Sequence, residues 1–273
     1  MNKYITINNK KPENLMGLLR RAAPVVWKGK AAEKTMCRNV EEAAQIMGNP
    51  KLSEINTELI DQYKMVIASH LAPGTVNYKM VNLHRILKFG YEREWIQKMP
   101  KFEYMTVYNE REKVYSEEEV MKVLSFLRER GRDEAADYFE VLYLTGMRRG
   151  ELLKAQPSQI DGNWLVLKAK DTKTKKSRRV PLNDRALELL KARLPFSLCA
   201  NSFLNHWNEA REAMGYKDDP EFVPHVLRHT RATMALSKTR NLVVVQKLLG
   251  HATVRTTQRY AKVLDDDLMD AVI

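Results

Sequence analysis

The regular spacing of apolar residues fails at residues 98–112 of this chain, and this break sets the expected number of domains. The segment KMPKFEYMTVYNERE mixes Pro100 with scattered aromatic and charged residues and has neither a helical nor a strand period. Ser116 and Glu119 follow it in the S-x-x-E pattern that caps a helix, ahead of a new apolar run. A chain of 273 residues is long enough for two domains. We therefore predict an extension at 1–13, a first domain at 14–108, a linker at 109–115, a second domain at 116–262 and a tail at 263–273.

The first domain has the sequence pattern of a helical domain. Ser53 is predicted to cap one helix, and Thr75 to open the next one after the chain break at Pro73-Gly74. The apolar residues of this second helix fall on one stripe, formed by Val76, Met80, Leu83 and Leu87. Its other face carries three cations, Lys79, Arg85 and Lys88. Charges of this kind are usually solvated, but they also suit contact with the phosphates of DNA.

The second domain is predicted to be mostly helical with one β-hairpin. A strand is expected around Trp164 and Val166 and its partner at 178–182, so that the basic cluster at 168–179 lies at the hairpin tip. Thr253 is expected to cap a short last helix that carries Tyr260. Other helices are predicted to start at Ser116 and to cover about 184–194, 202–214, 226–237 and 242–249. The expected fold class is α+β: mainly α, with a small β-sheet or hairpin in the second domain.

Charge and cysteine content narrow the function classes. The net charge of +12 favours an acidic partner, of which nucleic acid is the commonest. Cys37 and Cys199 form no CxxC pair, which argues against a disulfide framework and a thiolate zinc site. No apolar run approaches the ~20 residues needed to cross a bilayer, and the polar N-terminus lacks the core of a signal peptide. We therefore expect a cytoplasmic protein with no membrane contact.

Four segments of the second domain resemble one family, the tyrosine recombinases, also called the phage integrase family. They occur in the family's order and with its usual spacing, and a single one of them would be a weak match. The segments are LTGMRRGELL (144–153), KDTKTKKSRRVPL (170–182), PHVLRHTRAT (224–233) and LLGHATVRTTQRYA (248–261). The resemblance implies a helical core DNA-binding domain at 14–108 and a catalytic domain at 116–262.

The resemblance also implies which residues carry the chemistry. They are Arg148, Lys173, His225, Arg228, His251 and Tyr260. Arg148 is preferred to Arg149 because it fits the G-x-R spacing. Lys173 lies eight residues before Pro181, which favours it over the neighbouring lysines. Two of those neighbours, Lys175 and Lys176, are expected to contact DNA.

Physical chemistry supports these roles. Arginine pairs bidentately with phosphate and stays protonated, so Arg148 and Arg228 suit the scissile phosphate. Tyr260 is the expected nucleophile, with His225 as its base and Lys173 as the acid for the leaving oxygen. His251 is expected to hydrogen-bond the phosphate. The neighbours Glu151 and His229 are interpreted as structural, Glu151 as a partner of nearby cations and His229 as a support for Arg228 or for packing.

The function implied by the resemblance is site-specific DNA recombination through a 3′-phosphotyrosyl link and a Holliday junction, for a phage or mobile element. The family's logic implies double-stranded DNA as substrate, four protomers on two DNA sites, and no metal or other cofactor. A host DNA-bending protein or a directionality factor is a candidate partner, and the place of action is the prokaryotic nucleoid. The tail is expected to dock on a neighbouring protomer, or else to pack on its own domain or fray.

Three alternatives compete with this interpretation. A metal-dependent nuclease needs convergent carboxylates, and the acidic run at 265–267 has consecutive side chains that point in different directions. A type IB topoisomerase would share the chemistry but relax supercoils as a monomer. A non-catalytic DNA-binding protein of the same fold would need a substitution among the six residues, and none is present.

Overall fold

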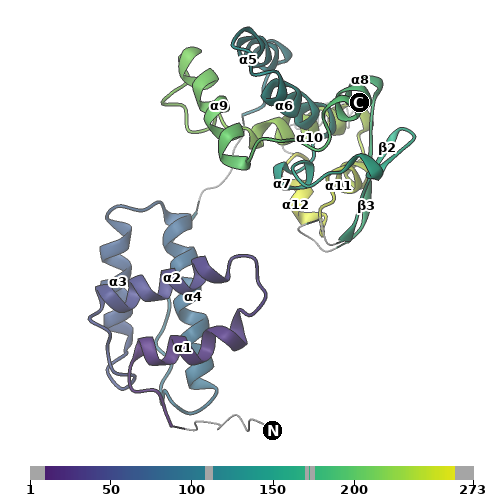
Figure 1. The fold of residues 1–273 in the computed structure, drawn as a ribbon. Helices are drawn as coiled ribbons and strands as arrows, with labels where there is room; N and C mark the ends of the chain where they lie inside the picture. Colours follow the sequence, from purple (N-terminus) through teal and green to yellow (C-terminus); the bar gives the residue numbers. More distant parts are fainter. Residues whose placement is uncertain (1–9, 108–112, 170–171, 173–175, 262–273) are drawn as a thin grey trace, which may run out of the picture. The chain divides into compact units, whose positions relative to one another are not determined.

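The computed structural model describes residues 10–107, 113–169, 172 and 176–261. The chain divides into two compact units, Met1–Asn109 (unit 1) and Glu110–Ile273 (unit 2). Figure 1 draws the helices and strands of both units. Each unit encloses a hydrophobic core of its own.

The described residues of unit 1 form four helices. These are α1 (Leu15–Val26), α2 (Glu33–Ile46), α3 (Thr57–Ala68) and α4 (Pro73–Tyr91). The apolar stripe predicted for α4 is confirmed, because all four of its residues are fully buried in the core of unit 1.

Two helix starts in unit 1 differ from the sequence prediction. The cap of α3 is Asn56, whose side chain accepts a hydrogen bond from the backbone N–H of Leu59, and Ser53 lies in the preceding turn. Helix α4 begins at Pro73, two residues before the predicted Thr75. Proline is well suited to the first turn of a helix, where its missing N–H is not needed.

Unit 2 surrounds one buried helix with further helices and a small sheet. Its described elements are α5 (Glu117–Glu129), α6 (Asp133–Thr145), α7 (Arg149–Leu152), the short 3-10 helix η1 (Pro157–Gln159), β1 (Ile160–Asp161), β2 (Trp164–Leu167), β3 (Arg178–Pro181), α8 (Asp184–Arg193), α9 (Ala200–Ala213), α10 (His225–Thr239), α11 (Leu242–Leu249) and α12 (Arg255–Gln258). The strands pair in the order β1-β2-β3, all antiparallel, with Leu165 opposite Val180. The expected fold class is therefore confirmed.

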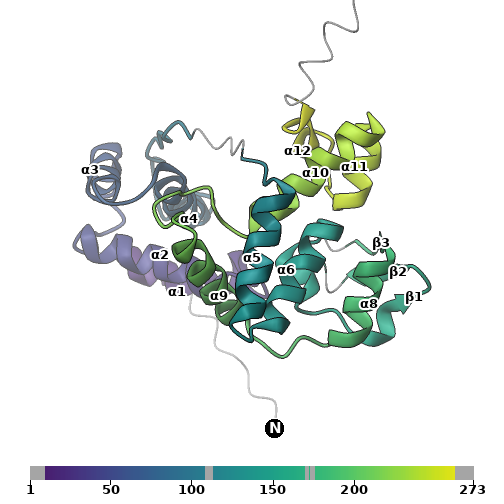
Figure 2. The same ribbon diagram turned by 90° about the horizontal axis from the view of Figure 1, so that it is seen from above.

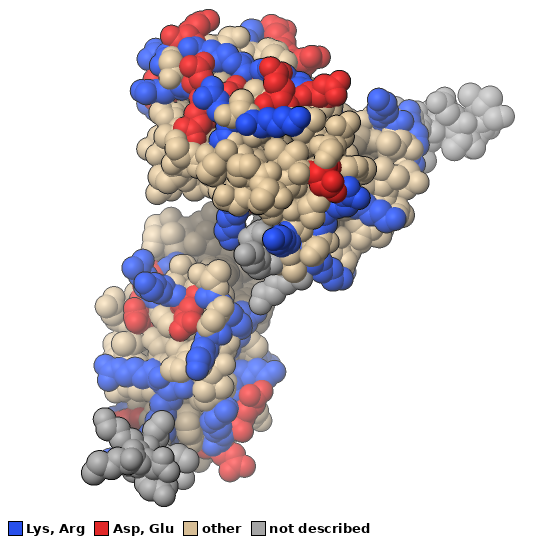
Figure 3. All heavy atoms as spheres, turned by 45° about the vertical axis from the view of Figure 1, so that its right-hand side comes forward, with Lys and Arg blue, Asp and Glu red and all other residues tan. Residues whose placement is uncertain are grey.

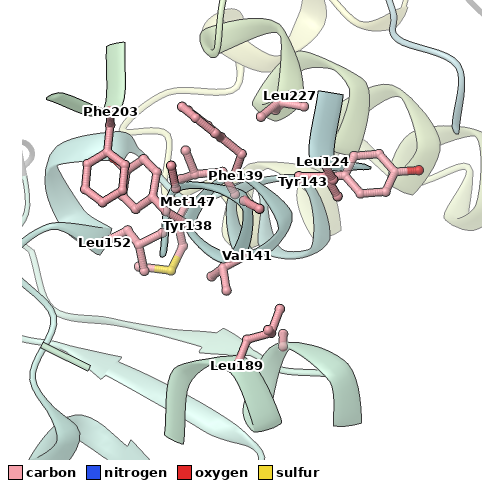
Figure 4. Packing of buried hydrophobic residues seen from close by; sticks show 14 of the residues in the cluster. Leu124, Tyr138, Phe139, Val141, Tyr143, Met147, Leu152, Leu189, Phe203 and Leu227 are labelled. Carbon is pink, nitrogen blue, oxygen red and sulfur yellow. The ribbon is translucent and has the colours of Figure 1, made fainter. Parts of the chain in front are cut away.

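The core of unit 2 is built on α6. Tyr138 stacks on Phe203 of α9 with ring centroids 3.9 Å apart (Figure 4). Phe139 and Trp207 pack edge to face. Aromatic pairs of this kind fix the helix both along its axis and in rotation. Helix α6 ends at Gly146, which has a φ of +65°, and the chain turns there directly into Arg148 at the start of α7.

Helices α10, α11 and α12 form a group at one end of unit 2 (Figure 2). Asn241 caps α11, and Gly250 ends it with a φ of +65°. The last helix is shorter than predicted: α12 ends at Gln258, and Tyr260 lies in the turn after it. Tyr260 nevertheless packs into the small apolar cluster between these helices.

The segment between the two units attaches to unit 2 before α5 begins. The capping box of Ser116 and Glu119 is confirmed. Just before it, Tyr115 is buried and its backbone N–H donates to Thr230 Oγ1 of α10 at 2.9 Å. Lys113 forms an ion pair with Asp219 at 2.6 Å. Lys113 and Tyr115 thus pack on the rest of unit 2.

None of the described helices combines the length and the apolar character needed to span a bilayer.

Candidate active site

Three arginines converge on the C-terminal end of α11. The consecutive carbonyl oxygens of residues 248–250 accept hydrogen bonds from Arg178 (2.5 Å), Arg228 (2.7 Å) and Arg148 (3.1 Å), in that order. The last carbonyls of a helix lack intrahelical partners and carry partial negative charge. They therefore attract guanidinium groups from three segments that are far apart in the sequence.

Glu151 balances part of this positive charge. Its Oε1 accepts from Arg148 Nη1 at 2.8 Å and its Oε2 from Arg178 Nη2 at 2.7 Å, and the residue is almost fully buried. Burial alone would raise the pKa of this carboxyl, but the charge of Arg178 and the hydrogen bonds from both arginines hold it below its usual range. The interpretation of Glu151 as a partner of nearby cations is confirmed.

Arg228 lies at the centre of the cluster. It projects from α10, is 4% exposed, and donates a second hydrogen bond to the carbonyl of Gly146 at 2.6 Å. Burial, followed by repulsion from Arg148 and Arg178, lowers the pKa of Arg228 to about 9. It therefore stays protonated at neutral pH. With three guanidinium groups and one carboxylate, this cluster carries a net positive charge that suits a phosphodiester.

Tyr260 lies between two imidazole rings. His229 is tilted against it with ring centroids 5.0 Å apart, and His251 lies nearly parallel to it at 6.3 Å. Burial raises the pKa of Tyr260, against the opposing charges of Arg228 and Arg259. The hydroxyl therefore keeps its proton at neutral pH until a base removes it.

His251 follows directly after α11. Its Nδ1 is 2.9 Å from Thr257 Oγ1, and this hydrogen bond fixes the orientation of the ring. Burial and the nearby cations, first of all Arg228, lower the pKa of His251 to about 4. The ring is therefore neutral at pH 7, with one N–H to donate.

His225 begins α10 and lines a small pocket together with Val226, His229, Arg259 and Tyr260. A titratable side chain thus lies at the same surface opening as the tyrosine. His229 is buried, and burial lowers its pKa to about 4. Its ring packs on Tyr260, in line with the packing role expected for it.

The fold thus brings together five of the six residues singled out from the sequence: Arg148, His225, Arg228, His251 and Tyr260. The sixth, Lys173, lies outside the described residues, as does Lys175. Lys176 is exposed at the loop end of the hairpin, where its backbone N–H donates to Thr172 Oγ1.

The cations of α4 differ in their surroundings. Lys79 forms an ion pair with Glu42 of α2, and its side chain is only 12% exposed. Arg85 and Lys88 are exposed, and Lys88 lies 3.8 Å from Glu92. In Figure 3, Lys and Arg mix with Asp and Glu at the upper edge of unit 2 and predominate on its lower part.

Arg178 is a residue of this site that the sequence reasoning missed. It was one of several cations in the basic cluster, and its neighbour Arg179 has the same chemistry. The alternation of a strand implies that one of the two points inward, but only the position of α11 decides that it is Arg178.

Comparison with known proteins identifies the family. The model of the phage integrase family matches residues 113–266. The tyrosine recombinase XerA of Saccharolobus solfataricus is 28% identical over 198 residues, which cover 71% of this chain and 65% of that protein. The integrase of Escherichia phage 186 is 35% identical over 132 residues, which cover 47% of this chain and 37% of the phage protein. The alignments thus span less than two thirds of the length of these relatives.

Solved structures share the fold. A lambda integrase tetramer bound to a Holliday junction superposes with a TM-score of 0.78 at 18% identity, over 90% of this chain and 77% of that one. The family model covers more than half of the sequence. This chain therefore belongs to the phage integrase family.

Proposed function

We propose that this chain is a site-specific DNA recombinase that cuts and rejoins DNA through a 3′-phosphotyrosyl intermediate. The observation that carries the proposal is the convergence of Arg148, Arg228 and His251 on the end of α11, with Tyr260 packed beside His251. The names of the relatives, a tyrosine recombinase and a phage integrase, support it.

The two arginines bind the scissile phosphate in this proposal. Each guanidinium has five N–H groups, and the hydrogen bonds given above use two of them in Arg148 to Glu151 and Gly250, and two in Arg228. Other N–H groups remain for the nonbridging oxygens. In this proposal the neutral ring of His251 donates one more hydrogen bond from Nε2, while its Nδ1 accepts from the Thr257 hydroxyl. These groups stabilise the charge that develops in the transition state.

The covalent step is a direct exchange at phosphorus. Tyr260 Oη forms a bond to the phosphorus atom, and the bond from phosphorus to the 5′-oxygen breaks. His225 takes the tyrosine proton, and the ammonium of Lys173 gives a proton to the leaving oxygen to yield a 5′-hydroxyl. The phosphotyrosyl link conserves the energy of the broken bond, so rejoining to a second 5′-hydroxyl is the reverse reaction and needs no ATP, metal or other cofactor.

The oligomeric state, the genetic source and the place of action of the chain belong to the same proposal. Lambda integrase forms a tetramer on a Holliday junction, and we extend this arrangement to four protomers of the present chain on two DNA sites. Unit 1 is proposed to bind the duplex, with Arg85 and Lys88 on the exposed face of α4. A phage or mobile element is the proposed source, acting at the nucleoid in the cytoplasm, with a host bending protein or a directionality factor as auxiliary partners.

The test is the capture of covalent DNA. Tagged chain is purified from cells under denaturing conditions, and the attached DNA is sequenced to define the site. A duplex of that sequence, nicked so that the cleaved end escapes, is then incubated with the purified chain. We expect a protein–DNA adduct that is lost in Tyr260→Phe while DNA binding is kept.

The absence of adduct from the unaltered chain, in cells and on sheared genomic DNA, would overturn the proposal. Relaxation of a supercoiled plasmid without exchange between two sites would instead identify a topoisomerase. A product joined from two sites, through a four-way intermediate, is the result that we expect.

A further inference from the structure

We infer that Arg178 is a positioning residue for DNA cleavage, which acts on Arg148 through the shared carboxylate of Glu151 and through the end of α11. The inference rests on the proposed function. It concerns a residue that does not face the phosphate, and it explains how the phosphate-binding arginine keeps its place and its charge.

The side chain of Arg178 is enclosed by protein. It is 9% exposed, and its two terminal nitrogens donate to Leu248 O and Glu151 Oε2. Its Nε has no hydrogen-bond partner among the described residues. A Cβ built on Gly250 would come within 2.5 Å of its Cδ and 2.8 Å of its Nε, so the backbone of Gly250 closes this side of the guanidinium. Both terminal nitrogens of Arg178 thus bind protein acceptors and its Nε lies against Gly250, so we assign it a positioning role and not a contact with the reacting phosphate.

One guanidinium nevertheless ties together three segments that carry the proposed chemistry. Arg178 begins β3, at the loop end of the hairpin. Glu151 lies in α7 and holds Arg148 at 2.8 Å. Leu248 lies in the last turn of α11, two residues before Gly250, whose carbonyl accepts from Arg148. Loss of Arg178 would release β3 from both α7 and the end of α11, which would then be joined only through Arg148 among the contacts described here.

Arg178 also contributes to the net positive charge of the cluster around Arg148. Glu151 Oε1 accepts from the Arg148 guanidinium, and Oε2 accepts from Arg178 Nη2 and from the backbone N–H of Arg148. Without Arg178 the carboxylate pairs with the guanidinium of Arg148 alone, and the cluster loses one positive charge. A cluster with less positive charge stabilises the phosphorane transition state less well, because that state carries more negative charge than the bound phosphodiester.

The positive charge of Arg178 also reaches His251. Four cations lower the pKa of this ring besides its burial, and in order of effect they are Arg228, Arg148, Arg178 and Arg259. Removal of Arg178 is therefore expected to raise the pKa of His251. If Arg178 contributed only packing, its removal would leave the pKa of His251 unchanged.

The test compares Arg178→Met with a matched variant, Arg179→Met. Arg179 is the next residue of β3, but its side chain is 53% exposed and pairs with Asp161 outside the site. With the nicked duplex defined above, single-turnover cleavage by Arg178→Met is expected to fall at least about tenfold, while DNA affinity stays within about twofold. Arg179→Met is expected to cleave like the unaltered chain.

Two further readouts separate positioning from mere stability. Because Arg178 acts in part through Glu151, the loss of cleavage in the double variant Arg178→Met/Glu151→Gln is expected to be smaller than the product of the two single losses. An NMR titration of His251 is expected to show a raised pKa in Arg178→Met and an unchanged one in Arg179→Met. Melting temperatures confirm that each variant is folded.

Additive effects in the double variant, an unaltered cleavage rate, or an unaltered His251 pKa would each overturn the inference. The His251 titration needs no DNA. If the unaltered chain forms no adduct, the proposed function fails, and the titration still decides whether Arg178 controls the charge at the arginine cluster.

Discussion

Gly250 is the position where a single methyl group tests the geometry of the arginine cluster most directly. It ends α11 with a φ of +65°, and its missing Cβ leaves the space that the Arg178 side chain fills. We predict that Gly250→Ala destabilises unit 2 and slows DNA cleavage. Gly215 is the matched control, since it lies in the same unit, has a φ of +79°, and has no atom within 4 Å of the position of an added Cβ.

The expected loss of stability in each variant follows from the surroundings of the two glycines. Both substitutions force alanine into the left-handed region, which costs about 1–2 kcal/mol. Only Gly250→Ala also displaces Arg178, which is held by hydrogen bonds to Glu151 and Leu248. Weakening one charge-assisted hydrogen bond adds about 2 kcal/mol. In a unit of this size 1 kcal/mol corresponds to about 2–4 °C in Tm, so the extra loss is about 4–8 °C.

Calorimetry of the full chain measures this difference, because both glycines lie in unit 2 and report on the same transition. Equal Tm losses in Gly250→Ala and Gly215→Ala would refute the reasoning. So would a Gly250→Ala variant that melts lower but cleaves DNA at the unaltered rate, since the carbonyl that accepts from Arg148 belongs to this residue.

Three further predictions concern stability. The pKa of His251 is about 4 in the folded state, below the ~6.5 of an unfolded histidine, so protonation favours the unfolded state. The neutral ring therefore makes its full contribution to the free energy of unfolding above about pH 6.5, and this contribution is lost as pH falls toward 4. Urea titrations at pH 7 and pH 5 should therefore show a smaller pH dependence in His251→Asn, and an unchanged dependence would contradict this assignment. Glu140 is buried and accepts hydrogen bonds from two arginines, so Glu140→Gln should lower the free energy of unfolding by about 3 kcal/mol, against about 0–1 kcal/mol for the exposed Glu188→Gln. Asn241→Ala removes the cap of α11 and should cost about 1 kcal/mol by the same assay, with loss of α11 protection in hydrogen exchange; full protection would speak against the cap.

Local signals in the sequence predicted much of the fold. The capping box at Ser116, the apolar stripe of α4 and the strands β2 and β3 depend on neighbours a few residues away, and each is present as expected. The first residue of a helix is harder to predict because several nearby residues can serve as its cap. Ser53 and Asn56 have equal chemistry for this purpose, and tertiary packing decides between them.

For the site as well, local motifs identify some residues, whereas others depend on tertiary structure. The ordered motifs singled out Arg148, Arg228 and Tyr260 from sequence alone. They gave no sign that Arg178 and Arg179 differ, although one is buried against Gly250 and the other lies above Trp164. That difference depends on where a helix some 70 residues further along the chain ends, and no local pattern contains this information.

The carbonyls at the end of α11 give the site an unusual kind of genetic robustness. Side-chain acceptors disappear when a codon changes, but the oxygens of residues 248–250 belong to the main chain and are present whatever amino acids are encoded there. As hydrogen-bond acceptors, Leu248 and Leu249 are thus free to drift within the limits of packing. Of the three residues that supply these carbonyls, only Gly250 cannot be replaced without a clash with Arg178.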